Sequence, residues 1–151
     1  MKAMVNMRYG SPDVLELTEV DKPIPRDDEA LVKVHAASVN PPDWHLREAR
    51  RESPACNSGC ANRSIGFWGA MWQVEAVGKN VTMLQPGDDV FGSPFVHGFG
   101  AFAQCVCVSE ELLVPKLATL AFEQAAAVPL AASTALQGLR DHGRIESGQK
   151  S

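Results

Sequence analysis

The chain has 151 residues, with 45% of them hydrophobic and 21% charged. This size fits one domain with its own core, and it argues against a complete enzyme that joins a catalytic domain to a separate nucleotide-binding domain. The formal net charge is −4. Because no basic block stands out either, the sequence gives no electrostatic reason to expect binding to nucleic acid or to an anionic membrane.

No apolar run in the sequence has the length of a signal-peptide core or of a membrane span. We therefore expect a cytoplasmic protein. The four cysteines are Cys56, Cys60, Cys105 and Cys107. In a chain without an export signal they are expected to be reduced thiols rather than a disulfide framework.

Short strands separated by turns are expected along most of the chain. Strand-like runs cover residues 3–8, 15–20, 30–37, 73–77, 90–91 and 101–108. Within the second run, Leu15 and Leu17 alternate with Glu16 and Thr18, which predicts a half-buried strand. Residues 47–72 show no sustained period and are predicted to be irregular. Short strands at this spacing favour a barrel or sandwich over a parallel sheet.

The last part of the chain is predicted to be helical. Thr119 is the candidate cap of an alanine-rich helix over residues 122–127, which Pro129 should interrupt. A second helix over residues 130–140 is expected to end near His142 and Gly143.

The stretch 98–103 matches the dinucleotide motif G-x-G-x-x-G/A by its letters alone. That motif binds pyrophosphate where a strand turns into a helix N-terminus, whereas residues 104–108 have strand character. We therefore do not expect phosphate binding at this stretch.

The cysteine spacing does not match a usual zinc site. Three residues separate Cys56 from Cys60, and one residue separates Cys105 from Cys107, which places the second pair on one face of a strand. No metal ligand is therefore assigned. A zinc site stays open only if the two pairs converge in space with His45 or His97.

Residues 38–44 (SVNPPDW) place an amide, a carboxylate and an indole directly after a strand. Loops after strands often carry chemistry. The alternative is a proline-fixed turn in which Asn40 and Asp43 bond their own backbone, and composition alone favours this turn.

The order of several motifs resembles the quinone oxidoreductase branch of the medium-chain dehydrogenase/reductase superfamily. Their order extends over about four-fifths of the chain and is more specific than any single motif. The matching segments are residues 1–5 (MKAMV), 9–15 (YGSPDVL), 31–34 (LVKV), 37–41 (ASVNP), 74–81 (VEAVGKNV), 86–92 (PGDDVFG), 100–103 (GAFA), 125–130 (AAAVPL) and 134–137 (TALQ).

The resemblance implies a mainly β fold, a GroES-like, partly open β-barrel with C-terminal helices. It implies that Asn40 and Thr134 border the nicotinamide of NADPH or NADH, and that Asn40 and Trp44 border a quinone or enone substrate. Zinc-dependent relatives place a Cys just after the corresponding strand, where this chain has Pro41 and Pro42. The resemblance therefore favours the zinc-free branch. Since hydride transfer belongs to the cofactor, no catalytic acid, base or nucleophile is assigned.

The sequence departs from the family just before residue 74. A Gly-x-Asp-x-x-Gly stretch is expected there, but residues 67–72 read FWGAMW. One hypothesis is a compensated shift of reading frame, because permitted codons for residues 65–73 read two bases later give RFLGRNVA. The alternative is a divergent loop. Sequencing the coding DNA decides, since a gene whose codons do not yield that string excludes the shift.

The resemblance also implies that residues 148–150 lead directly into the first strand of a nucleotide-binding domain. We therefore expect a GroES-like barrel over residues 1–121 and a helical connector over residues 122–151 toward an absent Rossmann domain. The expected function is the N-terminal part of an NAD(P)H-dependent quinone or enone reductase, with little activity and no cofactor bound by this chain alone. A non-enzymatic interaction module, a truncated remnant and self-association into a homodimer remain alternatives.

Overall fold

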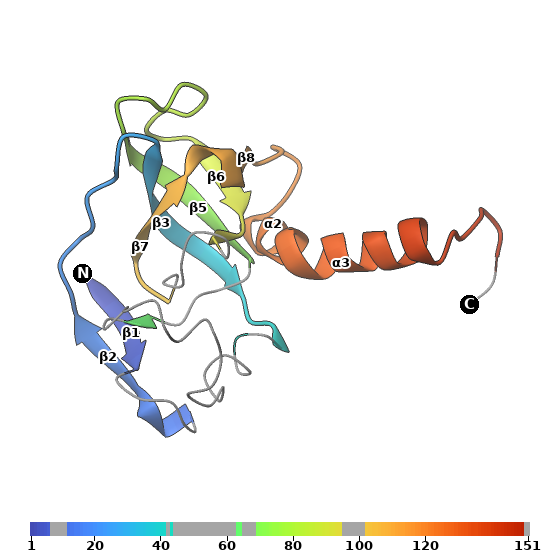
Figure 1. The fold of residues 1–151 in the computed structure, drawn as a ribbon, viewed down its shortest axis with the longest axis horizontal. Coiled ribbons are helices and arrows are strands. Elements are labelled where there is room, and N and C mark those ends of the chain that lie inside the picture. Colours follow the sequence, from blue (N-terminus) through green and yellow to red (C-terminus); the bar gives the residue numbers. More distant parts are fainter. Residues whose placement is uncertain (7–11, 42, 44–62, 65–68, 95–101, 150–151) are drawn as a thin grey trace.

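The computed structural model describes residues 1–6, 12–41, 43, 63–64, 69–94 and 102–149. Two antiparallel sheets form the body, and one helical arm extends away from it (Figure 1). The predicted mainly β fold with C-terminal helices is thereby confirmed. In the described ranges no helix combines the length and apolar composition that crossing a membrane requires.

The smaller sheet has the strand order β2-β1-β4, and the larger has the order β7-β3-β5-β6-β8. All described strand pairs are antiparallel. The strands are β1 (Lys2–Asn6), β2 (Leu15–Glu19), β3 (Glu29–Ser38), β4 (Arg63–Ser64), β5 (Gly69–Val77), β6 (Asp89–Gly92), β7 (Cys105–Ser109) and β8 (Leu113–Pro115). Short 3-10 turns occupy Pro12–Val14 and Glu110–Leu112.

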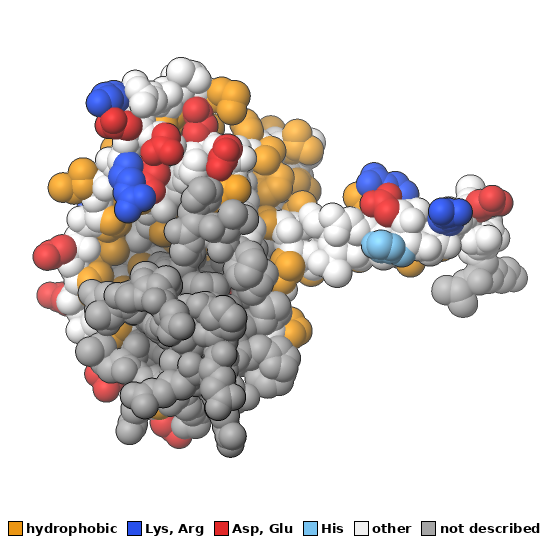
Figure 2. Space-filling view, in the orientation of Figure 1, with side chains coloured by type: hydrophobic (Ala, Val, Ile, Leu, Met, Phe, Trp, Pro, Cys, Tyr) orange, Lys and Arg blue, Asp and Glu red, His pale blue; other side chains and the backbone are white. Residues whose placement is uncertain are grey.

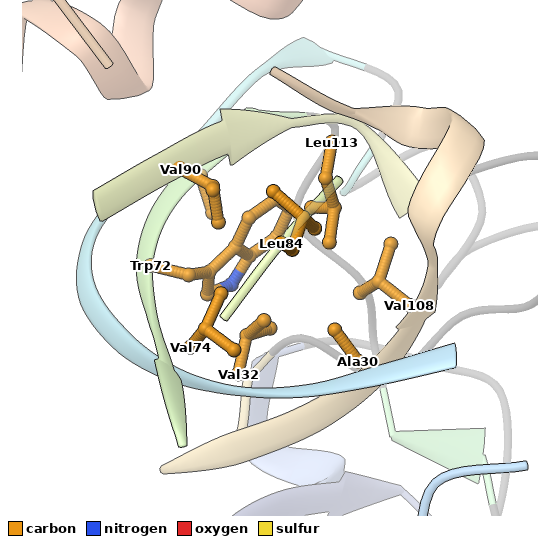
Figure 3. Close-up of a cluster of buried hydrophobic side chains, with 9 residues drawn as sticks. Ala30, Val32, Trp72, Val74, Leu84, Val90, Val108 and Leu113 are labelled. Carbon is orange, nitrogen blue, oxygen red and sulfur yellow. The ribbon is translucent and has the colours of Figure 1, made fainter. Parts of the chain in front are cut away.

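The larger sheet curls around one apolar core without closing into a complete barrel, because β7 and β8 are not paired with each other. Trp72 is fully buried in this core (Figure 3). The other buried members of the cluster are Ala30, Val32, Ala70, Val74, Leu84, Val90, Val108 and Leu113. This arrangement agrees with the partly open barrel that the sequence predicts.

Several details of the predicted strands are wrong. In the last predicted run, residues 102–104 precede β7 (Cys105–Ser109) instead of belonging to it. Residues 69–72 belong to β5 instead of the irregular segment. They are buried, and they continue the pairing of β5 with β3 and β6. Leu17 is 64% exposed although it alternates as a core residue should, because β2 is the edge of the smaller sheet. Residues 44–62 and 65–68 lie outside the described ranges, so the reading-frame hypothesis stays a hypothesis.

The arm is helical from Phe122 to His142. It consists of α2 (Phe122–Ala127), the π-helical turn η5 (Val128–Ala132), α3 (Ser133–Leu136) and the π-helical segment η6 (Gln137–His142). The predicted cap, Thr119, is wrong: the N-cap is Ala121. There the Gln124 side-chain oxygen accepts the Ala121 N–H at 2.9 Å, so the capping hydrogen bond comes from inside the first turn.

The prediction that Pro129 interrupts the helix is wrong, because helical segments follow one another without a break from Phe122 to Leu136. Proline removes one helical hydrogen bond, but here the Val128 N–H donates to the Ala125 carbonyl, and the Ser133 hydroxyl donates to the Val128 carbonyl at 3.1 Å. The wider π turn thus accommodates the ring within a continuous helix. The helix ends at His142 as expected, although the left-handed residue that follows is Arg144, with φ of 47°, rather than Gly143.

Candidate functional site

The loop after β3 forms a closed turn at the end of the barrel. The Asn40 N–H donates to Oδ2 of Asp43 at 2.6 Å, and the Asp43 N–H donates to the Asn40 carbonyl at 3.0 Å. The Asn40 side-chain nitrogen donates to the Ser38 carbonyl at 3.1 Å and to Ser38 Oγ at 3.0 Å. The expected turn, in which Asn40 and Asp43 bond neighbouring backbone, is therefore present.

This turn is fastened to β5 and to the helical arm. The Ser38 hydroxyl donates to the Gly69 carbonyl at 3.1 Å. A Cβ placed on Gly69 would lie 2.8 Å from the Ala126 carbonyl oxygen and 3.4 Å from Cβ of Pro129. The ends of β3 and β5 and the α2–η5 junction therefore meet at one point, and Asn40 lies beside it.

Asp43 is the one buried charged residue among those described, with 4% of its surface exposed. Burial raises the pKa of its carboxyl above the ordinary value of 3.8, and the hydrogen bond from the Asn40 backbone partly opposes this shift. Its second oxygen, Oδ1, is buried without a partner among the described residues. A buried carboxylate with a hydrogen bond to only one of its two oxygens lowers the stability of the fold when it is ionised.

The raised pKa of Asp43 predicts how stability depends on pH. Its folded-state pKa lies above its unfolded value, so the stability that the protonated carboxyl contributes is present at low pH and is lost as pH rises through the folded pKa. Between pH 3 and pH 7, wild type should therefore lose stability relative to Asp43→Asn, which does not titrate. Urea unfolding of both proteins at the two pH values measures this difference. A constant difference would contradict the account.

Two other residues expected at the site are not joined to Asn40. Thr134 is exposed on α3, in the arm beyond the α2–η5 junction. No hydrogen bond, ion pair or ring contact links it to Asn40 within the described part of the chain. Trp44 lies outside the described residues. The roles of these two residues therefore stay predictions.

Ser38 and Gly69 are site residues that the sequence reasoning did not single out. They are separated by 31 positions in the chain, and their contact follows from the pairing of β3 with β5. Spacing along the chain carries no signal for such a contact. The strand register that brings them together is Ser38 opposite Gly69.

Cys105 and Cys107 lie on β7, opposite Lys33 and Leu31 of β3, and so share one face as their spacing predicts. Cys105 Sγ donates to a Glu75 carboxylate oxygen at 3.8 Å, and Glu75 also pairs with Lys22. Burial, followed by the charge of Glu75, raises the pKa of the Cys105 thiol. Its raised pKa makes the Cys105 thiol a poor nucleophile at neutral pH.

No three His, Cys, Asp or Glu side chains come together to form a metal site in the part of the chain that the structure describes. The alternative zinc site needs Cys56, Cys60 and either His45 or His97, all of which lie outside that part. Residues 98–101 of the glycine motif also lie outside it. The residues after that motif form strand β7, as expected, and no helix begins there.

Cys107 is expected to react slowly with alkylating agents. Burial, followed by the charge of Glu29, raises the pKa of its thiol to about 11. At pH 8 its thiolate population is then about 0.1%, against roughly a quarter for a free cysteine. Alkylation by iodoacetamide, followed at Cys107 by tandem mass spectrometry, should be at least about tenfold slower than for free cysteine. A rate equal to that of free cysteine would show that the thiol is not shielded.

The barrel and its helical arm define the class of protein. Residues 26–118 match the family model of the alcohol dehydrogenase GroES-like domain. The chain belongs to this family. Its relatives are quinone oxidoreductases and enone reductases of the medium-chain dehydrogenase/reductase superfamily, which confirms the resemblance in the sequence.

Individual relatives cover almost the whole chain. This chain is 34% identical to the 2-methylene-furan-3-one reductase of Solanum lycopersicum, and the match covers 95% of this chain and 38% of that protein. The quinone oxidoreductase of Coxiella burnetii has 32% identity and a TM-score of 0.87, covering 98% of this chain and 46% of that one. The Escherichia coli quinone oxidoreductase, solved with NADPH, has 25% identity and a TM-score of 0.80 over 94% of this chain and 41% of that one. The chain thus spans less than half the length of each.

Proposed function

We propose that the chain supplies the nicotinamide side of an NAD(P)H-dependent reductase of quinones or enones. The observation that carries this proposal is the closed turn at Asn40, which fixes one polar side chain beside the junction of β3, β5 and α2. The relative solved with NADPH supports the choice of cofactor class. In this proposal residues 1–121 are the barrel, and residues 122–151 connect it to a Rossmann domain.

The residues have distinct roles in this proposal. Asn40 and Thr134 border the nicotinamide, and Asn40 and Trp44 border the substrate. A bound reduced nicotinamide supplies the hydride. The side chains of this chain orient the reacting partners and exclude water, and none of them is assigned a proton transfer. A cytoplasmic location belongs to the same proposal.

The amide of Asn40 suits a nicotinamide chemically. Its side-chain nitrogen donates to Ser38, and its side-chain carbonyl oxygen can only accept a hydrogen bond. A nicotinamide carboxamide carries the matching N–H donor. This one contact supplies only a fraction of the free energy that cofactor binding needs.

The isolated chain is therefore expected to show no reductase activity and no micromolar affinity for NADPH. The contacts that hold the adenosine and phosphates of a dinucleotide lie in a Rossmann domain, and without them the nicotinamide is not held in a reactive orientation. Calorimetric titration of NADPH into the 151-residue chain measures the affinity. A micromolar Kd would overturn this part of the proposal.

A second candidate function is a non-enzymatic interaction module that associates with itself. The arm carries two apolar side chains that are about half exposed, Leu136 (53%) and Leu139 (53%), and Ile145 (54%) follows shortly after its end. Figure 2 shows the arm standing clear of the body. Exposed apolar side chains on a separate helix favour association. Size-exclusion chromatography with light scattering distinguishes the two, since a stable monomer removes the support for this candidate.

A further inference from the structure

The side-chain amide of Asn40 is held in one orientation by two acceptors of Ser38. Its nitrogen lies 3.1 Å from the Ser38 carbonyl oxygen and 3.0 Å from Ser38 Oγ. A carbonyl oxygen only accepts hydrogen bonds. Turning the Asn40 amide over would bring its oxygen against that carbonyl and lose both hydrogen bonds, so the nitrogen faces Ser38.

The hydroxyl of Ser38 can only accept a hydrogen bond from Asn40. Its single hydrogen is donated to the Gly69 carbonyl at 3.1 Å, which leaves only lone pairs for the Asn40 nitrogen. The Gly69 carbonyl therefore fixes the Ser38 hydroxyl, and the hydroxyl fixes Asn40. This chain of hydrogen bonds runs from β5 through the end of β3 into the turn.

We propose that Ser38 is a positioning residue that makes Asn40 a hydrogen-bond acceptor toward the ligand. Asn40 then recognises a donor such as the N–H of a nicotinamide carboxamide, and it does not polarise the carbonyl of a quinone or enone, which would require a donor. This inference rests on the proposed function and makes it more specific. It assigns Asn40 to the cofactor rather than to the substrate carbonyl.

The first test needs no ligand. The solvent exchange of the Asn40 side-chain amide hydrogens is measured by NMR in wild type, Ser38→Ala and Ser38→Thr. Because Ser38→Ala removes one of the two acceptors, exchange should become at least about fivefold faster, whereas Ser38→Thr keeps the hydroxyl and should stay within about twofold of wild type. Unchanged backbone amide shifts in the core strands verify that each variant is folded. Equal exchange in wild type and Ser38→Ala would overturn the role of Ser38.

The second test asks what Asn40 recognises. The probes are 1-methyl-1,4-dihydronicotinamide and its 3-acetyl analogue, which lacks the carboxamide N–H, both titrated at millimolar concentration and followed at the Asn40 amide signals. Wild type should prefer the carboxamide by about five- to tenfold, the value of one neutral hydrogen bond. The preference should weaken in Ser38→Ala, which keeps only the backbone carbonyl as an acceptor for the Asn40 nitrogen, and remain in Ser38→Thr.

The outcomes separate this inference from the function on which it rests. Binding of both probes with equal affinity, or better binding of the acetyl analogue, would overturn the acceptor role of Asn40 while leaving a nicotinamide site in place. Retention of the full preference in Ser38→Ala would overturn the role of Ser38. Failure of both probes to shift Asn40 would contradict the proposed function, and the exchange measurement would still decide what Ser38 does.

Discussion

Replacing Trp72 by alanine is expected to lower the free energy of unfolding by about 3–5 kcal/mol. Trp72 is fully buried and has the largest side chain of the barrel core, where it contacts residues from the other strands of the sheet (Figure 3). Its removal leaves a cavity that the antiparallel strands around it cannot fill by small shifts. Urea unfolding followed by circular dichroism measures the loss.

Two further variants separate packing from the polar group of Trp72. Its indole N–H is buried without a partner among the described residues, so Trp72→Phe removes an unsatisfied donor as well as some volume. These effects oppose each other, and the net change should stay within about 1 kcal/mol. Leu17→Ala, at a side chain that is 64% exposed, should change stability by less than about 0.5 kcal/mol. An equal loss in Trp72→Ala and Leu17→Ala would contradict the placement of the core.

Gly69→Ala is expected to destabilise the protein by about 2–3 kcal/mol and to disturb the site at the same time. Its Cβ would lie 2.8 Å from the Ala126 carbonyl oxygen and 2.9 Å from Ser38 Oγ. Relief of the first contact moves the arm. Relief of the second moves the Ser38 hydroxyl and so breaks the hydrogen bonds that orient Asn40. Thermal unfolding gives the stability, and the Asn40 side-chain amide signals report the disturbance.

Gly138→Ala is the matched control for this substitution. Gly138 lies in the helical arm, and a Cβ there would meet no atom within 4 Å. Alanine in an exposed helical position should therefore stabilise the arm by about 0.5–1 kcal/mol and leave the Asn40 signals in place. If Gly69→Ala behaved like Gly138→Ala, the close approach of β5 to α2 would be wrong.

Local patterns in the sequence predict most of the barrel, because antiparallel strands of one curved sheet bury alternate side chains. Residues 30–37 predict β3, which the structure extends only to Glu29–Ser38. The same logic fails for β8, whose three residues are too few to show a period. It also fails at Leu17, because alternation does not reveal that a strand lies at an exposed edge.

The candidate site is predicted less completely than the fold. The residue types of the turn at Asn40 and Asp43 indicate hydrogen bonds to neighbouring backbone, and the structure contains them. The link from Ser38 to Gly69 depends on the register between β3 and β5, which no local pattern encodes. Helix propensity likewise does not show that a π turn accommodates Pro129. That depends on the hydrogen bonds from the Val128 N–H to the Ala125 carbonyl and from the Ser133 hydroxyl to the Val128 carbonyl.

The most direct test of the central claim compares the two ends of a dinucleotide on the 151-residue chain. 1-Methyl-1,4-dihydronicotinamide and adenosine 2′,5′-bisphosphate are titrated separately at equal millimolar concentration, and NMR chemical shifts map where each binds. If the chain supplies the nicotinamide side alone, the nicotinamide probe shifts the backbone and side-chain amides of Asn40, and the adenosine probe shifts neither. Tighter binding of the adenosine probe, or no shift at Asn40 with the nicotinamide probe, would contradict the account.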